Sequence, residues 1–346
     1  MCGLINTIDI NAISRYFLSV ISLLSLTTIG WSDSHRSSLP PVQPKVDLVG
    51  DWYPSVWGKA DQRGAANRLT PQKVLEAVRL IRTGQVYQLG RLYEAGMPVY
   101  GTRHFSLRIP RTSGPLGENQ LTWHEEIVSG ELGQVGTQFD GLGHIGVQVG
   151  VNGDKNEMRW YNGFSAQEMG SAYGLLKLGI EKLHPIIARG VLIDIQAIKG
   201  RDMTAGEVIT LADVKAALKR QGMSDFKLME GDAVAFRTGW ESHWEDAATY
   251  NAGCPGIGME VARWLADGNV GVTAGDTWPV DAVPNPDPDC VFCVHTFLQT
   301  RHGIVNHENL RLSELAEAGV YQFAYFFAPA PIRGGTGSMG TPVAMW

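Results

Sequence analysis

The sequence lacks several features that would assign it to a class of protein at once. No run of basic residues is longer than a pair, and the net charge is a mildly acidic −6. Nucleic-acid binding needs a basic patch or stripe, so we expect no nucleic-acid partner. With 44% apolar and 18% charged residues, the chain has the composition of a protein that folds around a core.

Common catalytic motifs are also absent. The chain contains no G-x-S-x-G nucleophile elbow, no H-E-x-x-H zinc helix and no phosphate-binding loop with its lysine. The glycine-rich stretch 334–340 lacks that lysine and does not begin a helix. We interpret it as a substrate-facing loop or a plain turn.

Cysteine is scarce, with four residues in the whole chain: Cys2, Cys254, Cys290 and Cys293. The last two form a single C-x-x-C pair. A structural zinc site needs four ligands and no second pair is present, so the pair is weak evidence for zinc. A disulfide, a redox pair and two packed thiols remain open, and we favour packed thiols.

The main uncharged apolar run lies near the N-terminus. Arg15 precedes this run over residues 16–30, which is shorter than the roughly 20 residues of a transmembrane helix. The pattern is typical of a secretory signal peptide, with a buried N-terminal helix as the alternative. We predict a signal peptide over residues 1–30, a linker over 31–47 and no stable membrane span in the mature chain. The mature protein is then periplasmic or secreted, or cytoplasmic if the segment is retained.

Helix and strand patterns alternate after residue 50. Thr70 and Thr210 each cap an apolar pattern of helical spacing that ends at a glycine, and residues 255–268 show a third such pattern. Short apolar runs typical of buried strands lie between these helix patterns along the chain. We expect strands at residues 86–90, 184–195, 231–240 and 270–277. The sequence therefore predicts an α/β or α+β fold, mostly in one domain.

Residues 133–144, GQVGTQFDGLGH, gather polar side chains between glycines. Read as a strand, this stretch places Gln134, Gln138 and Asp140 on one face, because side chains two apart share a face. His144 follows four residues later. Such a face can bind a ligand, or it can be the solvent-exposed face of an edge strand.

A second polar cluster lies at residues 294–310, which hold His295, His302, His307 and Glu308. Such residues are usually exposed on a helix and its turn. They can also build a metal site from a helix and a following loop.

GTQFDGLGH, residues 136–144, resembles the H-x-G-T-H-x-D-x-P-x-H motif of the cyclase family of metal-dependent hydrolases, which includes kynurenine formamidase and isatin hydrolase. Further parts of the chain resemble the same family, namely residues 50–74, the strands at RGVLIDI and GDAVAFRTGW, and residues 295–315. The resemblance covers roughly residues 48–346. It implies one large α/β domain with a swivelling β/β/α fold over that range.

The resemblance also implies a reaction and a set of site residues. A metal-activated water would open a formamide, cyclic amide or lactone bond. Asp140 would be a metal ligand and His144 the general acid and base. His295 and Glu308 would match the family's downstream histidine and glutamate, which bind a second metal where one is present. Gln138 and Gln134 stand where the family motif has its two ligand histidines.

This departure from the motif affects the expected metal. A glutamine offers a neutral carbonyl oxygen in place of an imidazole nitrogen, and oxygen ligands suit harder ions. We expect a divalent ion, Mn²⁺ or Zn²⁺ with Mg²⁺ also allowed, held by Gln138, Asp140, His295 and Glu308. Gln134 is a further ligand or supports one. Loss of the metal is the alternative.

Three functions stay open. The first is a metal-dependent hydrolase, the second a metal-dependent lyase or cyclase on the same scaffold, and the third an exported binding protein without catalysis. Five aromatic residues are candidates for the wall of a pocket for a small planar substrate, although most of them are expected to be structural: Trp123, Trp160, Tyr161, Trp240 and Trp278. Family members commonly assemble, so we also expect a homo-oligomer.

Overall fold

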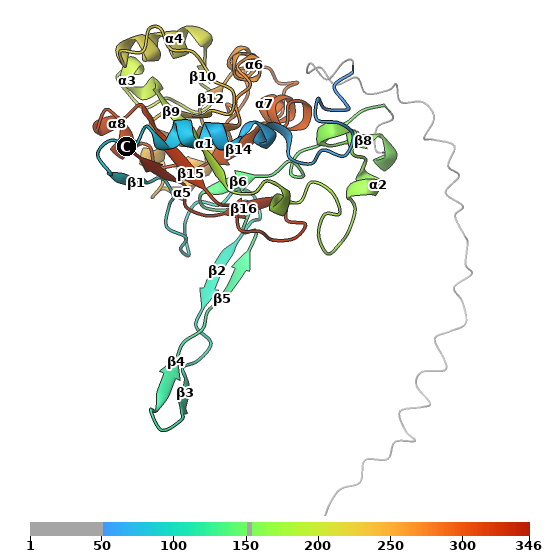
Figure 1. The fold of residues 1–346 in the computed structure, drawn as a ribbon, viewed down its shortest axis with the longest axis vertical. Coiled ribbons are helices and arrows are strands. Elements are labelled where there is room, and N and C mark those ends of the chain that lie inside the picture. Colours follow the sequence, from blue (N-terminus) through green and yellow to red (C-terminus); the bar gives the residue numbers. More distant parts are fainter. Residues whose placement is uncertain (1–50, 151–153) are drawn as a thin grey trace, which may run out of the picture. The chain divides into compact units, whose positions relative to one another are not determined.

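The computed structural model describes residues 51–150 and 154–346, which fold around one nine-stranded sheet (Figure 1). The strands follow in the order β1 (Val86–Gln88), β17 (Val343–Met345), β15 (Gln322–Phe327), β9 (Ile186–Asp194), β11 (Ala233–Arg237), β13 (Val272–Gly275), β14 (Val305–Glu308), β6 (Gln138–Asp140) and β16 (Gly337–Met339). The predicted signal peptide and linker, and the first residues of the predicted domain, lie outside the described residues.

The centre of the sheet is parallel and its flanks are antiparallel. β9, β11, β13 and β14 run parallel to one another. β15 joins β9, and β6 joins β14, in the opposite direction. A parallel centre needs connections that cross a face of the sheet, and helices supply them. The α-helices of the described residues are α1 (Pro71–Val78), α2 (Ala166–Met169), α3 (Ile195–Lys199), α4 (Leu211–Arg220), α5 (Ala247–Ala252), α6 (Met259–Asp267), α7 (Cys293–His295) and α8 (Ser313–Glu317), and Thr296–Arg301 forms the π-helix η8. Short 3-10 helices are η3 (Gly64–Arg68), η4 (Lys155–Glu157), η5 (Tyr161–Gly163), η6 (Ile180–Lys182) and η7 (Trp240–His243).

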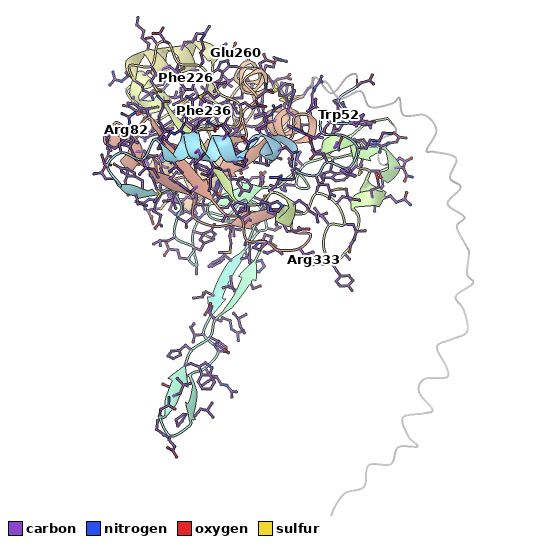
Figure 2. The ribbon with its side chains drawn as sticks, viewed as in Figure 1. Trp52, Arg82, Phe226, Phe236, Glu260 and Arg333 are labelled. Atoms are coloured by element: carbon purple, nitrogen blue, oxygen red, sulfur yellow. A yellow bond between two sulfur atoms is a disulfide. The ribbon has the colours of Figure 1, made fainter. Side chains whose placement is uncertain are left out.

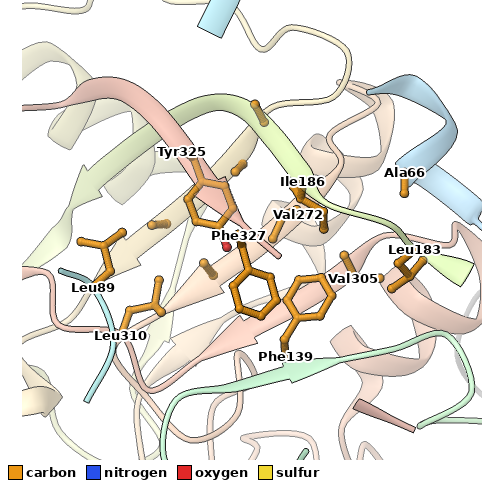
Figure 3. Packing of buried hydrophobic residues seen from close by; sticks show 14 of the residues in the cluster. Ala66, Leu89, Phe139, Leu183, Ile186, Val272, Val305, Leu310, Tyr325 and Phe327 are labelled. Carbon is orange, nitrogen blue, oxygen red and sulfur yellow. The ribbon is translucent and has the colours of Figure 1, made fainter. Parts of the chain in front are cut away.

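Alternate residues of the central strands β9 and β11 enter two hydrophobic cores, one on each face of the sheet. In β11, Ala233 and Ala235 join the core that includes Phe139 and Phe327, while Val234 and Phe236 face the other core. Figure 3 shows the first core, with Phe139 and Phe327 in contact. The second core is covered by α4 and α6. Both faces are therefore buried, as the continuous apolar strand patterns predicted.

The helices predicted after Thr70 and Thr210 begin where these capping residues indicated, but α1 ends at Val78 and not at the predicted stop, Gly84. The Thr70 side chain accepts a hydrogen bond from the Lys73 N–H at the start of α1. Thr210 and Asp213 form a reciprocal capping box at the start of α4. These contacts involve neighbours in the sequence, so a local pattern is enough to predict them.

Two predictions for glycine-rich stretches need correction. Residues 133–137 are a turn and only Gln138–Asp140 is strand, so Gln134 does not share a strand face with Asp140. Residues 337–339 are not a loop or a turn: they form β16, whose Gly337 pairs with Asp140. A three-residue strand between turns gives too weak an alternation to recognise in the sequence.

A long hairpin, which we call the arm, extends away from the sheet (Figure 1). It is built from β2 (Phe105–Arg108), β3 (Ser113–Leu116), β4 (Leu121–Trp123) and β5 (Ile127–Gly130), which pair only with one another. Most arm side chains are exposed, as the sticks in Figure 2 show. Two further small sheets pair β7 (Val147–Gln148) with β8 (Met158–Arg159), and β10 (Val208–Ile209) with β12 (Gly256–Ile257). Within residues 51–150 and 154–346, no helix is long and apolar enough to span a bilayer.

Candidate metal centre

Two neighbouring strands supply the carboxylates of the site. β6 and β14 are antiparallel, with Gln138 opposite Glu308 and Asp140 opposite Asn306. Directly opposite residues project from the same face of an antiparallel pair, and so do residues two apart. Asp140 and Glu308 therefore face the same side of the sheet, although 168 positions separate them in the chain.

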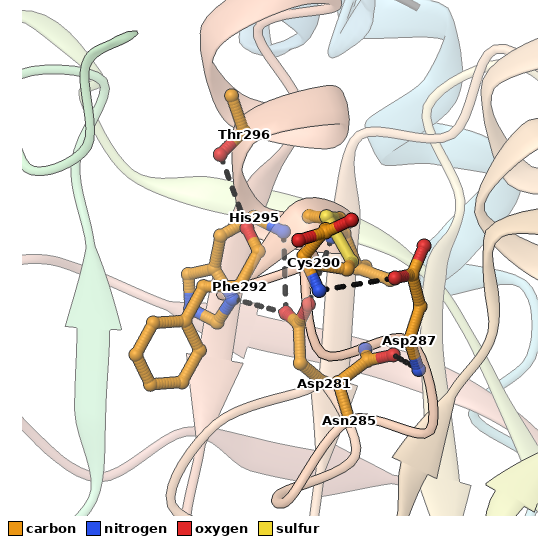
Figure 4. The surroundings of a disulfide bond; sticks show 10 residues. Asp281, Asn285, Asp287, Cys290, Phe292, His295 and Thr296 are labelled. Atoms are coloured by element: carbon orange, nitrogen blue, oxygen red, sulfur yellow. Dashed lines mark hydrogen bonds and ion pairs between the residues drawn. A yellow bond between two sulfur atoms is a disulfide. The ribbon is translucent and has the colours of Figure 1, made fainter. Parts of the chain in front are cut away.

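α7 brings the histidine to this face. The Asp281 carboxylate accepts hydrogen bonds from the backbone N–H groups of Val294 and His295, at 2.8 and 3.2 Å. It also lies 2.5 Å from Nδ1 of His295 (Figure 4). With Nδ1 held by a carboxylate, Nε2 of His295 is the ring nitrogen left to face the site.

The three predicted ligands meet in one buried group. Nε2 of His295 lies 2.9 Å from Oε1 of Glu308 and 3.5 Å from Oδ2 of Asp140. One ligand atom from each residue lies within 4.8 Å of the others, and all three residues are buried. We call Asp140, His295 and Glu308 the triad. The structure brings these residues together, and their binding of an ion stays a prediction.

The two glutamines contact the carboxylates through their amide nitrogens. Nε2 of Gln134 donates to Oδ1 of Asp140 at 2.6 Å. Nε2 of Gln138 donates to Oε2 of Glu308 at 2.5 Å and to the Trp278 carbonyl at 3.2 Å. Gln138 thus orients a carboxylate of the triad. Gln134 does the same from the turn before β6, and its own ligand role also stays a prediction.

The donor set fits a divalent cation. Oε1 of Gln134 is buried and makes no hydrogen bond to the described residues, while the buried Oδ2 of Asp140 and Oε1 of Glu308 both face Nε2 of His295. Two buried carboxylates repel each other and lose hydration, and a cation between them would offset both effects. Carboxylate oxygens with one imidazole nitrogen are ligands that Zn²⁺ and Mn²⁺ accept.

The ionisable groups of the triad shift one another's pKa. Burial raises the pKa of Asp140, but His144, His295 and the Gln134 amide outweigh it and lower that pKa to about 2. Burial and the charge of Asp140 raise the pKa of Glu308 to about 7. Burial lowers the pKa of His295, but Glu308, Asp140 and Asp281 outweigh it and raise that pKa well above 6.5. An entering cation would therefore displace protons from the site.

His144 lies beside the triad in the turn after β6. Its Nε2 is 3.9 Å from Oδ1 of Asp140, and its side chain is 20% exposed. Burial lowers the pKa of His144 and outweighs the opposing effect of Asp140, while the positive charges of His295 and Arg103 act in the same direction as burial. The turn is glycine-rich because it packs closely: a Cβ at Gly141 would lie 2.8 Å from the Thr336 carbonyl oxygen.

A cavity of about 140 Å³ opens onto the triad and His144. This is smaller than the roughly 300–1,000 Å³ of sites for drug-sized ligands, so a small substrate fits best. Its other lining residues are Tyr100, Arg103, Gln134, Gln138, Ile145, Trp278, Pro279 and Phe292. Of the five aromatic candidates from the sequence, only Trp278 lines this cavity. Tyr161 and Trp240 are buried in hydrophobic clusters, and Trp123 lies on the arm.

The other two histidines of the second cluster do not join the triad. His307 projects from the opposite face of β14, where it packs between Phe139 and Phe327 and contacts the Tyr325 hydroxyl. Burial lowers the pKa of His307 to about 3, so it is neutral. His302 packs against Phe297, with ring centroids 4.6 Å apart. The predicted helix and following loop are thus a helix and a strand, because Glu308 ends β14.

The preference for packed thiols at the C-x-x-C pair is wrong. Cys290 and Cys293 form a disulfide in the structure (Figure 4). The turn that begins α7 places their Cα atoms 5.4 Å apart, within the range that a disulfide bridges. Phe292 lies between them and lines the cavity, so the disulfide closes a loop at the cavity wall.

Several site residues carry no clear signal in the sequence. Asp281 begins the segment DAVPNPDPD and looks no different there from Asp287 or Asp289. Tyr100 and Arg103 precede the arm and lie far from both polar clusters along the chain. Only the fold shows that these three residues contribute to the site.

The fold and the site define a class: an α/β protein with two buried carboxylates and an imidazole placed to hold a metal ion. The chain belongs to the cyclase family, since the family model described as "Putative cyclase" matches residues 75–282, more than half of the chain.

Solved structures show the same fold. A novel cyclase is 30% identical, with a TM-score of 0.72, over 84% of this chain and 98% of that one. Isatin hydrolase A from Ralstonia solanacearum is 21% identical, with a TM-score of 0.56, over 80% of this chain and 97% of that one. Isatin hydrolase A from Labrenzia aggregata, bound to benzyl benzoate, is 18% identical, with a TM-score of 0.55, over 75% of this chain and 93% of that one. Among curated proteins, none matches.

Proposed function

We propose that the protein is a metal-dependent hydrolase that opens a C–N bond of a formamide or cyclic amide, or a lactone bond, in a small substrate. The observation that supports this proposal is the buried triad of Asp140, His295 and Glu308, with His144 beside it at a small cavity. Solved structures with the same fold are named isatin hydrolases, which also supports a hydrolase function for this protein.

The residues divide the work as follows. Asp140, His295 and Glu308 would hold the divalent ion, and Gln134 and Gln138 orient the two carboxylates through their amide nitrogens. When bound, such an ion lowers the pKa of water and polarises a carbonyl group. Zn²⁺ and Mn²⁺ accept both the carboxylate oxygens and the imidazole nitrogen of the triad, whereas Mg²⁺ prefers oxygen ligands and matches only the carboxylates.

His144 moves the proton in this mechanism. In its neutral form Nε2 accepts a proton from the attacking water, and the resulting imidazolium donates it to the leaving nitrogen or oxygen. Asp140, 3.9 Å from Nε2, stabilises the transient positive charge. The lowered pKa of His144 keeps the ring neutral, and therefore basic, near neutral pH.

The test combines metal analysis with an assay. The protein is prepared without chelators or an affinity tag, its metal content is measured, and cyclic amides, formamides and lactones are screened for products that gain one water. We expect about one or two equivalents of a divalent ion, as in mononuclear and dinuclear metal sites. A protein that takes up no divalent ion, or a product of unchanged mass, would contradict the proposal.

The His144→Ala variant supplies the matched control. Because general acid–base catalysis contributes about 10²–10⁴-fold, we expect turnover to fall by that factor. Its metal content is expected to match the wild type, since His144 is not a ligand in this proposal. Unchanged turnover would remove His144 from the mechanism.

A further inference from the structure

Arg103 brings a fixed positive charge to the cavity. It is the only lysine or arginine among the lining residues, and it is half-buried. One guanidinium nitrogen, Nη1, donates to the Gln134 carbonyl at 3.3 Å. No carboxylate among the described residues forms an ion pair with it. One N–H group of the guanidinium is thus held by the Gln134 carbonyl, and other N–H groups can donate to a ligand.

Aromatic rings form the wall next to Arg103. Tyr100 stacks on Trp278 with ring centroids 4.2 Å apart and an interplanar angle of 15°. The Arg103 guanidinium carbon lies 5.8 Å from the centroid of the Tyr100 ring. Phe292 meets Trp278 edge-on at 6.1 Å. Flat apolar surfaces of this kind favour a planar, ring-containing ligand.

This wall is connected to the reacting end of the cavity. The Trp278 carbonyl accepts a hydrogen bond from Gln138, which also holds Glu308. Arg103 contacts the backbone of Gln134, which holds Asp140. The positive charge of Arg103 also acts on His144. A ligand on the aromatic wall would therefore share one cavity with Arg103 and the triad.

We propose that Arg103 is a specificity-determining residue that binds a carboxylate on the substrate. The substrate would be a small, planar, ring-containing amide or lactone with an acid group on the side of the ring away from the scissile bond. Arginine suits this role because its planar guanidinium pairs with a carboxylate through two parallel hydrogen bonds. The inference rests on the proposed hydrolase function for the reaction, but the binding it predicts can be measured without turnover.

The test compares two probes that differ in charge and share a ring, benzoate and benzamide. Their dissociation constants are measured by calorimetry or ligand-observed NMR, with chelator-treated protein and with protein loaded with Mn²⁺. In the chelator-treated wild type we expect benzoate to bind about tenfold more tightly than benzamide, as one charge-assisted pair allows.

Variants assign this preference to a residue. Arg103→Gln is expected to bind both probes within about twofold of each other, and Arg103→Lys to keep part of the preference, because an ammonium cannot form the bidentate pair. Arg82→Gln is the matched control, since Arg82 is exposed and does not line the cavity (Figure 2). Retained benzamide binding shows that a variant is folded.

Three results would overturn the role of Arg103. They are equal affinities in the wild type, a preference that survives Arg103→Gln, and benzoate binding that appears only with Mn²⁺, which would place the carboxylate on the ion. Failure of the hydrolase proposal looks different. If Arg103→Gln loses the preference for benzoate but no amide or lactone is hydrolysed, the carboxylate-binding role of Arg103 stands and the hydrolase function is rejected.

Turnover supplies a second readout once a substrate is found. The quantity measured is kcat/KM for a carboxylated lactone divided by kcat/KM for the same lactone without the carboxylate. We expect Arg103→Gln to lower this ratio by about tenfold, mainly by raising KM for the carboxylated substrate. An unchanged ratio would reject substrate recognition by Arg103 while leaving hydrolysis established.

Discussion

Asp281 determines how His295 faces the triad. Its carboxylate contacts the ring Nδ1 and two backbone N–H groups at the start of α7. An amide at this position keeps one acceptor oxygen and loses the negative charge. We predict that Asp281→Asn weakens metal binding by about tenfold to a hundredfold, the usual effect of removing a group that orients a ligand. The measurement is the dissociation constant for Zn²⁺ or Mn²⁺ by competition with a chelating dye.

Asp287→Asn is the matched control for Asp281→Asn. Asp287 lies in the same loop, is exposed, and accepts a hydrogen bond from the Asp289 N–H at 3.0 Å. We expect metal affinity within about twofold of the wild type, because surface substitutions away from special contacts have small effects. Equal losses in both variants would attribute the effect to the loop as a whole.

The protonation of His144 sets the expected pH dependence of catalysis. A general base must be neutral, so activity falls as pH drops through its pKa. Burial lowers the pKa of His144 below 6.5, and His295 and Arg103 lower it further against the pull of Asp140. A bound cation would act in the same direction. We predict that the acid limb of kcat/KM has its midpoint below pH 6.5, and a midpoint above that value would contradict the assignment.

Among the strands, the packing of β9 against β15 depends on Gly190. Gly190 pairs with Phe323, and a Cβ at this glycine would lie 2.1 Å from the Phe323 ring. Phe323 is buried, so the ring has no free space to move into. We predict that Gly190→Ala destabilises the protein by about 1–3 kcal/mol through overpacking, measured by urea unfolding.

A double variant tests this reason for the loss. Phe323→Leu makes room for the added methyl group, so it is expected to cost less in the Gly190→Ala background than alone. The coupling energy between neighbours in contact is about 0.5–3 kcal/mol. Strictly additive effects would show that Gly190→Ala acts through the backbone of β9 and not through the ring.

The elements differ in how well the sequence predicts them. The helices that begin after Thr70 and Thr210, and the strands around Ile186 and Ala233, follow from caps and apolar runs that involve near neighbours. β6 and β16 could not be predicted at their true lengths. Each has three residues. β6 is held as a strand by pairing with β14 and β16, and β16 by pairing with β6.

The arm is the feature of the whole molecule that bears on assembly. Its strands pair only with one another, and an isolated two-stranded hairpin is marginally stable in water. Six large apolar side chains are exposed on it: Leu107, Ile109, Leu116, Leu121, Ile127 and Val128. Exposed apolar side chains gathered on one projecting element are typical of an interface. We propose that a second copy of the chain covers the arm, in keeping with the expected homo-oligomer.

Light scattering with size-exclusion chromatography tests this assembly. We predict a dimer or larger species for the wild type and a smaller species for the triple variant Leu107→Ser, Ile109→Ser and Leu116→Ser. The matched control places the same changes at exposed apolar residues off the arm, Leu75, Val78 and Val86. A monomeric wild type, or an equal effect of both triple variants, would reject the proposal.

Export also concerns the whole molecule, and it stays a prediction. The apolar run of residues 16–30 supports a signal peptide, and residues 1–50 lie outside the described part of the chain. We therefore keep a periplasmic or secreted location as a proposal about the mature protein.

The sequence by itself determined the α/β class, two helix caps and the central buried strands, and through the family resemblance it predicted Asp140, His144, His295 and Glu308 as site residues. These follow from local patterns or from the two stretches of chain that resemble the family's motifs. Tertiary structure alone decided that Gln134 and Gln138 meet the carboxylates through nitrogen, that Asp281 holds His295, and that Arg103 lines the cavity. The physical reason is that no local pattern encodes these contacts. Gln138 meets Glu308, 170 residues away, only because β6 pairs with β14, and the turns that bring Gln134 to Asp140 and Asp281 to His295 take their shape from the folded chain.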